Sequence, residues 1–144
     1  MPTISFSKWN GDDGLLNYIE SRTHCKPFSG SGINIRYNNK TAILKSVDNT
    51  YYYDDDLSCE NNIQYTLFGH NGDQDINEKR FNEPLLNEDK VENIYLYRFI
   101  PGKKIREYIW YGKYRIVSRF SKIHVGKDHN ERKIIILNLQ KILD

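Results

Sequence analysis

The alternation of apolar and polar residues predicts a chain built mainly of β-strands. Residues 33–37 alternate with a period of two, Asn38-Asn39 has the composition of a turn, and residues 41–47 are apolar and partly β-branched, so this region predicts a hairpin. Later strands are predicted at residues 63–68, 93–100, 105–111, 114–125 and 134–137. Turn residues at Pro101-Gly102, at Gly112 and between Gly126 and Asn130 would interrupt them.

Helical spacing is confined to two short segments. Asp12-Asp13-Gly14 precedes apolar residues at helical spacing, which predicts a helix that ends near Arg22 and begins with an Asp cap. Asp75 would cap a second helix toward Leu86, but Pro84 lacks an N–H group, so two short turns are favoured over one long helix.

These elements predict an α+β fold. The strands are mostly sequential, so we expect a curled antiparallel β-barrel with two or three short helices packed outside. A chain of 144 residues has room for a single domain, residues 1–144, around one packed core.

Composition bears on the compartment. No apolar run approaches the roughly 20 residues that cross a bilayer, and the N-terminus lacks the pattern of a signal peptide. We therefore expect a soluble intracellular protein, cytoplasmic or, in a eukaryotic host, nuclear, without a membrane partner. Cys25 and Cys59 are too few for a disulfide framework, so they are expected to be free thiols.

The net charge of +2 hides a segregation of charge along the chain. Residues 4–47 carry six basic and three acidic residues, residues 48–92 carry three basic and twelve acidic, and residues 101–133 carry ten basic and three acidic. These segments either neutralise one another within the fold or present a basic face that would bind phosphate.

The most informative segment runs from Tyr65 to Gln74. Its sequence is Tyr-Thr-Leu-Phe-Gly-His-Asn-Gly-Asp-Gln, and Asn82 and Leu85 follow it. This segment resembles the signature of the SRA (SET- and RING-associated, or YDG) family, in which a strand ending in Tyr-Thr-Gly leads through a glycine-rich loop to Gly-Asp. The Gly-Asp-Gln form resembles the branch found in bacterial modification-dependent restriction systems. The resemblance covers about residues 28–125.

The resemblance implies a PUA-like barrel that binds double-stranded DNA and flips a methylated or hydroxymethylated cytosine into a pocket. The implied pocket residues are Tyr53, Asp55, Asp56, Tyr65 and Thr66. The two tyrosines would sandwich the base, and one of the two aspartates would accept a hydrogen bond from its exocyclic amine. Leu67 stands where the family carries Gly, so its side chain would narrow the pocket or mark the loss of base binding.

The chemistry of these side chains agrees with that role. Flipping a base costs a few kcal/mol, and stacking it on an aromatic ring returns about 1–3 kcal/mol. An ionised Asp accepts from an amine and repels a carbonyl, so it selects cytosine or adenine over thymine. A methyl group adds only about 0.8 kcal/mol, so discrimination by a methyl alone should be modest, and sharper for a hydroxymethyl group.

Two further sets of residues are predicted to contact DNA. The loop set is Gly69, His70, Asn71, Gly72, Asp73, Gln74 and Asn82. The phosphate set is Lys79, Arg80, Lys103, Lys104, Arg106, Lys113 and Arg115. Glycines allow a backbone to approach DNA closely, and basic side chains fix the register on the duplex. The same residues also suit a tight turn and the solvated face of a strand.

Other functions stay open at this point. The main alternative is a PUA-like RNA-binding or protein-interaction module with no modified-base pocket. Glu131-Arg132-Lys133 has the spacing of a nuclease motif but no matching upstream Asp, and His24, Cys25, Cys59 and His70 fit no zinc spacing. We therefore expect no catalysis, metal or cofactor, and a separate nuclease or other effector protein as a partner.

Overall fold

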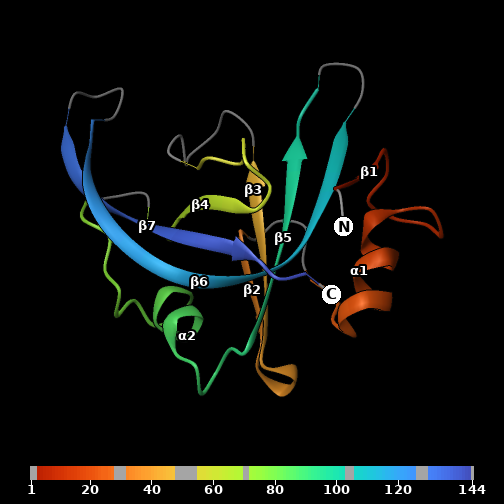
Figure 1. Ribbon diagram of the computed structural model, residues 1–144, viewed down its shortest axis with the longest axis horizontal. Coiled ribbons are helices and arrows are strands. Elements are labelled where there is room, and N and C mark those ends of the chain that lie inside the picture. The colour runs from red at the N-terminus through yellow and green to blue at the C-terminus, as the bar shows by residue number, and fades with distance from the viewer. Residues whose placement is uncertain are drawn as a thin grey trace.

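A single curved sheet of seven strands makes up most of the structure (Figure 1). The computed structural model describes residues 3–27, 32–47, 55–69, 72–102, 106–125 and 130–143. In chain order the elements are β1 (Ile4–Phe6), α1 (Leu15–Thr23), β2 (Ile33–Arg36), the 3-10 helix η1 (Tyr37–Asn39), β3 (Thr41–Val47), β4 (Asn62–Thr66), α2 (Asn82–Leu86), β5 (Asn93–Ile100), β6 (Glu107–Val125) and β7 (Glu131–Lys141). The predicted hairpin and the predominance of strands are confirmed.

The sheet is mixed, which corrects the expectation of antiparallel pairing throughout. Its order is β2-β3-β5-β6-β7-β4, with β1 on β6. β3 and β5 run parallel, from Thr41 beside Asn93 to Val47 beside Phe99, because the chain passes through β4 and α2 before it returns. Among the described residues the pairings end at β2 and β4, so the sheet is curved and mostly antiparallel without a closed barrel.

The two central strands contribute side chains to two apolar cores. Leu44 and Leu96 point into the larger core, which lies inside the curved sheet and extends to α2. Ile43 and Tyr97, one residue away in each strand, point to a second core that includes Ile19 of α1. This alternation follows from the pleat, because successive side chains of a strand face opposite sides. Both faces of β3 and β5 are therefore covered.

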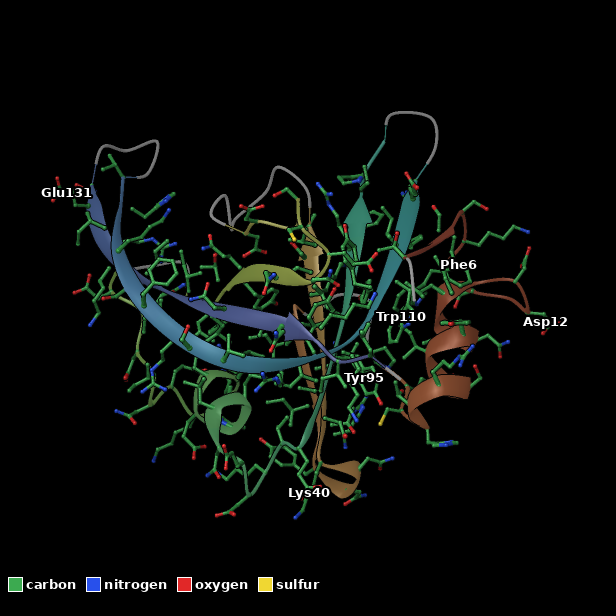
Figure 2. The ribbon with its side chains drawn as sticks, in the orientation of Figure 1. Phe6, Asp12, Lys40, Tyr95, Trp110 and Glu131 are labelled. Carbon is green, nitrogen blue, oxygen red and sulfur yellow. The ribbon has the colours of Figure 1, made fainter. Side chains whose placement is uncertain are left out.

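Aromatic rings fill the second core. Figure 2 shows Tyr95 and Trp110 between the sheet and α1, and their rings stack with centroids 5.7 Å apart. Tyr18 of α1 meets Trp110 edge-on at 5.9 Å, and Trp9 lies 5.4 Å from the ring of Tyr97. These contacts attach α1 to the sheet through ring packing.

Helix α1 begins one residue later than an Asp cap would place it. Its N-cap is Gly14, and no side chain caps the helix. The N–H groups of Leu15 and Leu16 instead donate to the carbonyls of Lys8 and Trp9, at 2.9 Å each. A Cβ on Gly14 would lie only 2.5 Å from the Trp9 carbonyl oxygen, so this close backbone approach requires glycine.

The second helical region divides into a turn and a short helix, as Pro84 predicts. The Asp75 carboxylate accepts from the N–H of Asn77 at 2.9 Å, but the helix begins only at Asn82. Its capping group is Glu78, whose carboxylate accepts from the N–H groups of Phe81 and Asn82 at 2.9 and 3.1 Å. Partial burial works to raise the pKa of Glu78, but these backbone hydrogen bonds outweigh it and the pKa is lowered.

Gly112 does not divide β6, in contrast to the sequence-based expectation. Leu96 lies opposite Gly112 and Tyr97 lies opposite Trp110, so Tyr111 is an extra residue on β6. Gly112 has a φ of 104°, which few other residues adopt. The glycine forms a β-bulge that bends a strand of 19 residues instead of ending it.

Two further expectations concern cysteines and membrane segments. Cys25 and Cys59 are both free, the first buried and the second exposed, which confirms the predicted thiols. Neither α-helix in the described part of the chain has the length and hydropathy needed to cross a bilayer.

One carboxylate joins both ends of the chain to the turn before β4. Glu60 accepts from the backbone N–H of Thr3 at 3.0 Å and from the ammonium of Lys141 at 2.8 Å. The Lys141 side chain is only 4% exposed, and the hydroxyl of Tyr114 donates to the Glu60 carbonyl at 2.6 Å. The hydrogen bond and charge of Lys141 hold the pKa of Glu60 below its usual value of 4.5, although burial opposes this shift.

We predict that Glu60→Gln destabilises the protein by about 1 kcal/mol at pH 7, because a nearly buried ammonium loses its counter-ion. The folded-state pKa of Glu60 is depressed, so its stabilisation is complete above pH 4.5 and is lost as the pH falls through the folded value. Urea unfolding of both proteins along a descending pH series measures this, with Glu20→Gln on exposed α1 as the control. A stability difference that stays constant down to the lowest pH would contradict the prediction.

Candidate functional site

A polar cluster forms where β3 and β4 end. Asp55 lies beside β4 because the next residue, Asp56, forms an isolated bridge with Gln64. The Asp55 carboxylate accepts from the Thr66 N–H at 2.6 Å and from the Ser46 hydroxyl at 2.7 Å. Ser46 and Thr66 are each 3% exposed, and Asp55 is half-buried. The carboxylate is therefore fixed in position by two donors.

The Thr66 hydroxyl has no hydrogen-bond partner among the described residues, although it is buried. A buried hydroxyl without a partner costs about 1–3 kcal/mol relative to one that is satisfied. Unsatisfied groups of this kind are rare in folded proteins and mark positions where a ligand or water can bind. The hydroxyl belongs to the same residue whose backbone N–H holds Asp55.

The structure distinguishes the two candidate aspartates. Asp56 is exposed, and its carboxylate accepts from the N–H and the hydroxyl of Ser58 at 3.0 and 2.6 Å. These two hydrogen bonds lower the pKa of Asp56. Asp56 thus closes a local turn, whereas Asp55 faces the cluster at the strand ends.

Leu67 does not narrow this cluster. Its side chain is 0% exposed and packs in the larger core. Phe68 packs against the same core, whereas Thr66 is not part of it. The departure from the family pattern is accommodated by the core and leaves Asp55 and Thr66 unobstructed by Leu67.

Tyr65 is a core residue in this structure. It is 2% exposed, and its hydroxyl lies 3.0 Å from the Gly32 carbonyl and 3.2 Å from the Lys45 carbonyl. The ring is buried in this structure, and the stacking role expected from the sequence stays a prediction. Tyr53, the other expected stacking residue, lies outside the described residues.

Gln74 holds the loop after β4 through three hydrogen bonds. Its amide nitrogen donates to the carbonyls of Leu67 and Gly69 at 2.7 and 3.1 Å, and its amide oxygen accepts from the Ile135 N–H at 2.7 Å. Gly69 has a φ of 140°, and a Cβ there would lie 3.1 Å from the Gln74 side chain. Gln74 is 4% exposed and connects the loop to β7, and its predicted contact with DNA stays a prediction.

Asn82 holds the same loop from the other side. Its side-chain oxygen accepts from the Phe68 N–H, and its nitrogen donates to the carbonyls of Phe68 and Asp75, each at 2.9 Å. Asn82 is 0% exposed, so its side chain is part of the fold in this structure, and its contact with DNA stays a prediction. The exposed Asp73 accepts from the Lys133 N–H at 2.7 Å, while His70 and Asn71 lie outside the described residues.

Sequence reasoning missed two residues of this region. Ser46 is a hydroxyl residue near the end of a largely apolar strand, and that contrast is the available signal. Arg132 lies in the nuclease-like sequence, yet its guanidinium donates to the carbonyls of Gly69 and Gly72 at 2.6 and 3.4 Å. No sequence pattern links residues 60 positions apart in this way.

The described residues of the predicted phosphate set are not confined to one element, and they make different contacts. Arg80 lies over the rings of Phe68 and Phe81, at 5.2 and 5.3 Å. Lys113 lies over Tyr95 in the second core, and Arg115 donates to Gln140. Lys79 and Arg106 are exposed, and Lys103 and Lys104 lie outside the described residues.

The described residues contain no group of three His, Cys, Asp or Glu side chains that could hold a metal ion. Glu131 and Lys133, the nuclease-like pair, lie at the exposed start of β7, where the Lys133 backbone binds Asp73 and Gln74. Their backbone role joins the loop to the sheet. His70 of the candidate metal ligands lies outside this part of the chain.

Similarity to known proteins is found at the level of structure. No family model and no curated protein matches the sequence. KRYPTONITE, solved with mCHG DNA and SAH, matches with a TM-score of 0.61 and 15% identity over 99% of this chain. The SUVH5 SRA complex with methylated CHH DNA matches with a TM-score of 0.57 and 19% identity over 89%. The sulfur binding and SRA domains of ScoMcrA, solved with phosphorothioated DNA, match with a TM-score of 0.58 and 19% identity over 100%.

The chain has the fold of an SRA domain. It spans 84% of the SUVH5 chain, but only 32% of the KRYPTONITE chain and 40% of the ScoMcrA chain. The resemblance of the Tyr65–Gln74 segment to the SRA family is confirmed at the level of the fold, whereas a closed barrel is not seen among the described residues. In this fold Gln74 and Asn82 form a buried clamp, and Ser46, Asp55 and Thr66 form a separate polar cluster.

We predict that Asn82→Ala destabilises the protein by about 2–4 kcal/mol, because it leaves one buried N–H and two carbonyls without their partner. Denaturant unfolding measures the loss, and amide hydrogen exchange should accelerate in residues 67–75. Asn62→Ala, on the exposed start of β4, is the control and should change stability by less than about 0.5 kcal/mol. Unchanged amide hydrogen exchange in residues 67–75 of the Asn82 variant would show that Asn82 does not hold the loop in place.

Proposed function

We propose that this chain is a DNA-binding module that recognises a modified cytosine by base flipping and does not itself catalyse a reaction. The observation that carries the proposal is the polar cluster of Ser46, Asp55 and Thr66 at the ends of β3 and β4 of an SRA fold. The neighbours lend support, since KRYPTONITE and the SUVH5 SRA domain were solved with methylated DNA and ScoMcrA with phosphorothioated DNA. The PUA-like closed barrel implied by the resemblance is part of this proposal.

The chemistry of the cluster suits the amino edge of cytosine. The Asp55 oxygens accept hydrogen bonds from Ser46 and Thr66 within the protein, and a carboxylate has room for about four. The Asp55 carboxylate would also accept the exocyclic amine, and the Thr66 hydroxyl would bind a ring nitrogen or the carbonyl of the same base. Thymine, which presents a carbonyl in place of the amine, would be repelled.

The loop after β4, which Gln74 and Asn82 bind, would enter the duplex without a change in its conformation. Gln74 and Asn82 bind the loop on both sides and connect it to β7 and α2. A loop already fixed in this way loses little conformational entropy on binding. A nuclease or other effector, attached or separate, would then act on the DNA that the module has bound.

Equilibrium binding distinguishes this function from its alternatives. Matched duplexes that carry cytosine, methylcytosine or hydroxymethylcytosine are compared with single- and double-stranded RNA at two salt concentrations. Tighter binding to a modified duplex is expected, with a salt dependence that reflects phosphate contacts. Equal affinity for all DNA duplexes, or preference for RNA, would exclude a modified-base reader.

We predict that Asp55→Asn weakens binding to the modified duplex by about tenfold or more, because a hydrogen bond to a charged acceptor is worth about 1.5–3 kcal/mol. Asp56→Asn is a matched control, since it makes the same change at the adjacent exposed residue, and it should bind nearly as well as the wild type. Thermal unfolding of both variants checks that the fold is intact. Equal effects of the two substitutions would show that Asp55 does not contact the base.

A further inference from the structure

The distal half of β6 has a strand edge that no other strand occupies among the described residues. β5 pairs with β6 only as far as Tyr114, so residues 115–125 pair with β7 alone. Figure 1 shows this part of β6 along the outer margin of the curved β6–β7 hairpin, which ends beside Glu131 in Figure 2. An open edge of this length is a template for another strand.

The hydrogen-bond ladder shows which residues direct backbone groups to this edge. The Leu67 N–H donates to the Ile135 carbonyl at 2.9 Å, so the backbone groups of Ile135 point toward β4. Direction alternates along an antiparallel strand, so Ile136 points toward its partner Phe120 on β6. Ser121, the partner of Ile135, therefore directs its N–H and carbonyl away from β7. The outward-pointing positions are Arg119, Ser121 and Ile123.

Exposed apolar side chains gather on the same stretch. Four of the six large apolar side chains that are exposed in the described residues lie between residues 117 and 125. They are Val117 (47% exposed), Phe120 (38%), Ile123 (60%) and Val125 (56%). Phe120 faces one side of the strand and Ile123 and Val125 face the other, so exposed apolar side chains border this edge on both faces. Exposed apolar surface of this kind marks an interaction site.

Charge identifies the kind of strand that this edge accepts. A groove of about 710 Å³ runs between β6 and residues 85–94, and its far wall carries the exposed carboxylates of Glu88 and Asp89. Residues 115–125 contain no acidic side chain and carry Arg115, Arg119 and Lys122. The acidic wall is complementary to a basic, apolar strand, and β6 is itself such a strand.

We propose that two copies of this chain associate by antiparallel pairing of their β6 edges about a two-fold axis at Phe120. In this register Phe120 faces Phe120, Arg119 faces Ser121, and Lys122 faces Ser118. Val117, the extra residue at a bulge of β6, lies near Ile123 of the other copy. Between residues 118 and 122 no two basic residues oppose each other, so this stretch is complementary to its own reverse. Each basic strand then lies along the acidic wall of the other copy.

Disulfide trapping tests the register. Phe120 directs its backbone toward β7, so the central pair is a non-hydrogen-bonded pair with Cα atoms about 4.5 Å apart, within the range of a disulfide. In a Cys59→Ser background, Phe120→Cys is expected to form a covalent dimer under mild oxidation. Lys122→Cys, which faces Ser118 of the other copy, is the matched control and is expected to form no covalent dimer. Equal trapping of the two variants, or none at residue 120, would overturn the proposal.

The dimer dissociation constant of the DNA-free protein, measured by sedimentation over a dilution series, tests the pairing of the β6 edges. The substitutions used for it change no apolar residue. Ser121→Arg places an Arg opposite Arg119 twice in the dimer and should raise the dimer dissociation constant between about twofold and thirtyfold. Ser121→Glu should lower it by a similar factor. Asn10→Arg and Asn10→Glu make the same charge changes in the exposed turn before α1 and serve as controls. A monomeric wild type, or equal responses at residues 10 and 121, would disprove edge pairing.

Discussion

Strand β7 forms hydrogen bonds along both of its edges, and the rest of the molecule is arranged around it. Residues 114–125 of β6 pair with one edge of β7. β4 pairs with the other edge, at residues 136–140 of β7. Where β4 ends, the same edge continues with Leu67 and then with the Gln74 side chain, which substitutes for a strand at Ile135. The loop that follows β4 is therefore an extension of the sheet, and its shape is determined by the strand that it borders.

This arrangement explains why polar residues in the loop are buried. A side-chain amide carries both a donor and an acceptor, so Gln74 and Asn82 can each complete several backbone hydrogen bonds where no strand is available. The cost of burying them is offset by the backbone groups that they satisfy. Residues 67–69 and 73–75 are thereby held against β7 and α2.

Period-two alternation was sufficient to predict the hairpin, most later strands and the mainly β character, because local side-chain patterning determines which face of a strand is buried. It could not predict that β3 and β5 pair in parallel, since that depends on the path of the chain between them. It also failed at Gly112, where a break and a bulge have the same composition. In the candidate site, the segment 65–74 was found because its residue types are distinctive. The burial of Tyr65 and the contact of Arg132 with Gly69 depend on strands far away in the sequence, and no local pattern encodes them.

The Glu60 carboxylate gives the fold a property of a different kind. Its two oxygens bind Thr3 and Lys141, so the first and last strands are fastened to a single point. Because the two ends of the domain lie close together, the domain can be inserted into a longer polypeptide without strain across the sheet. The same point is also a weakness, because protonation of one carboxyl loosens both ends together.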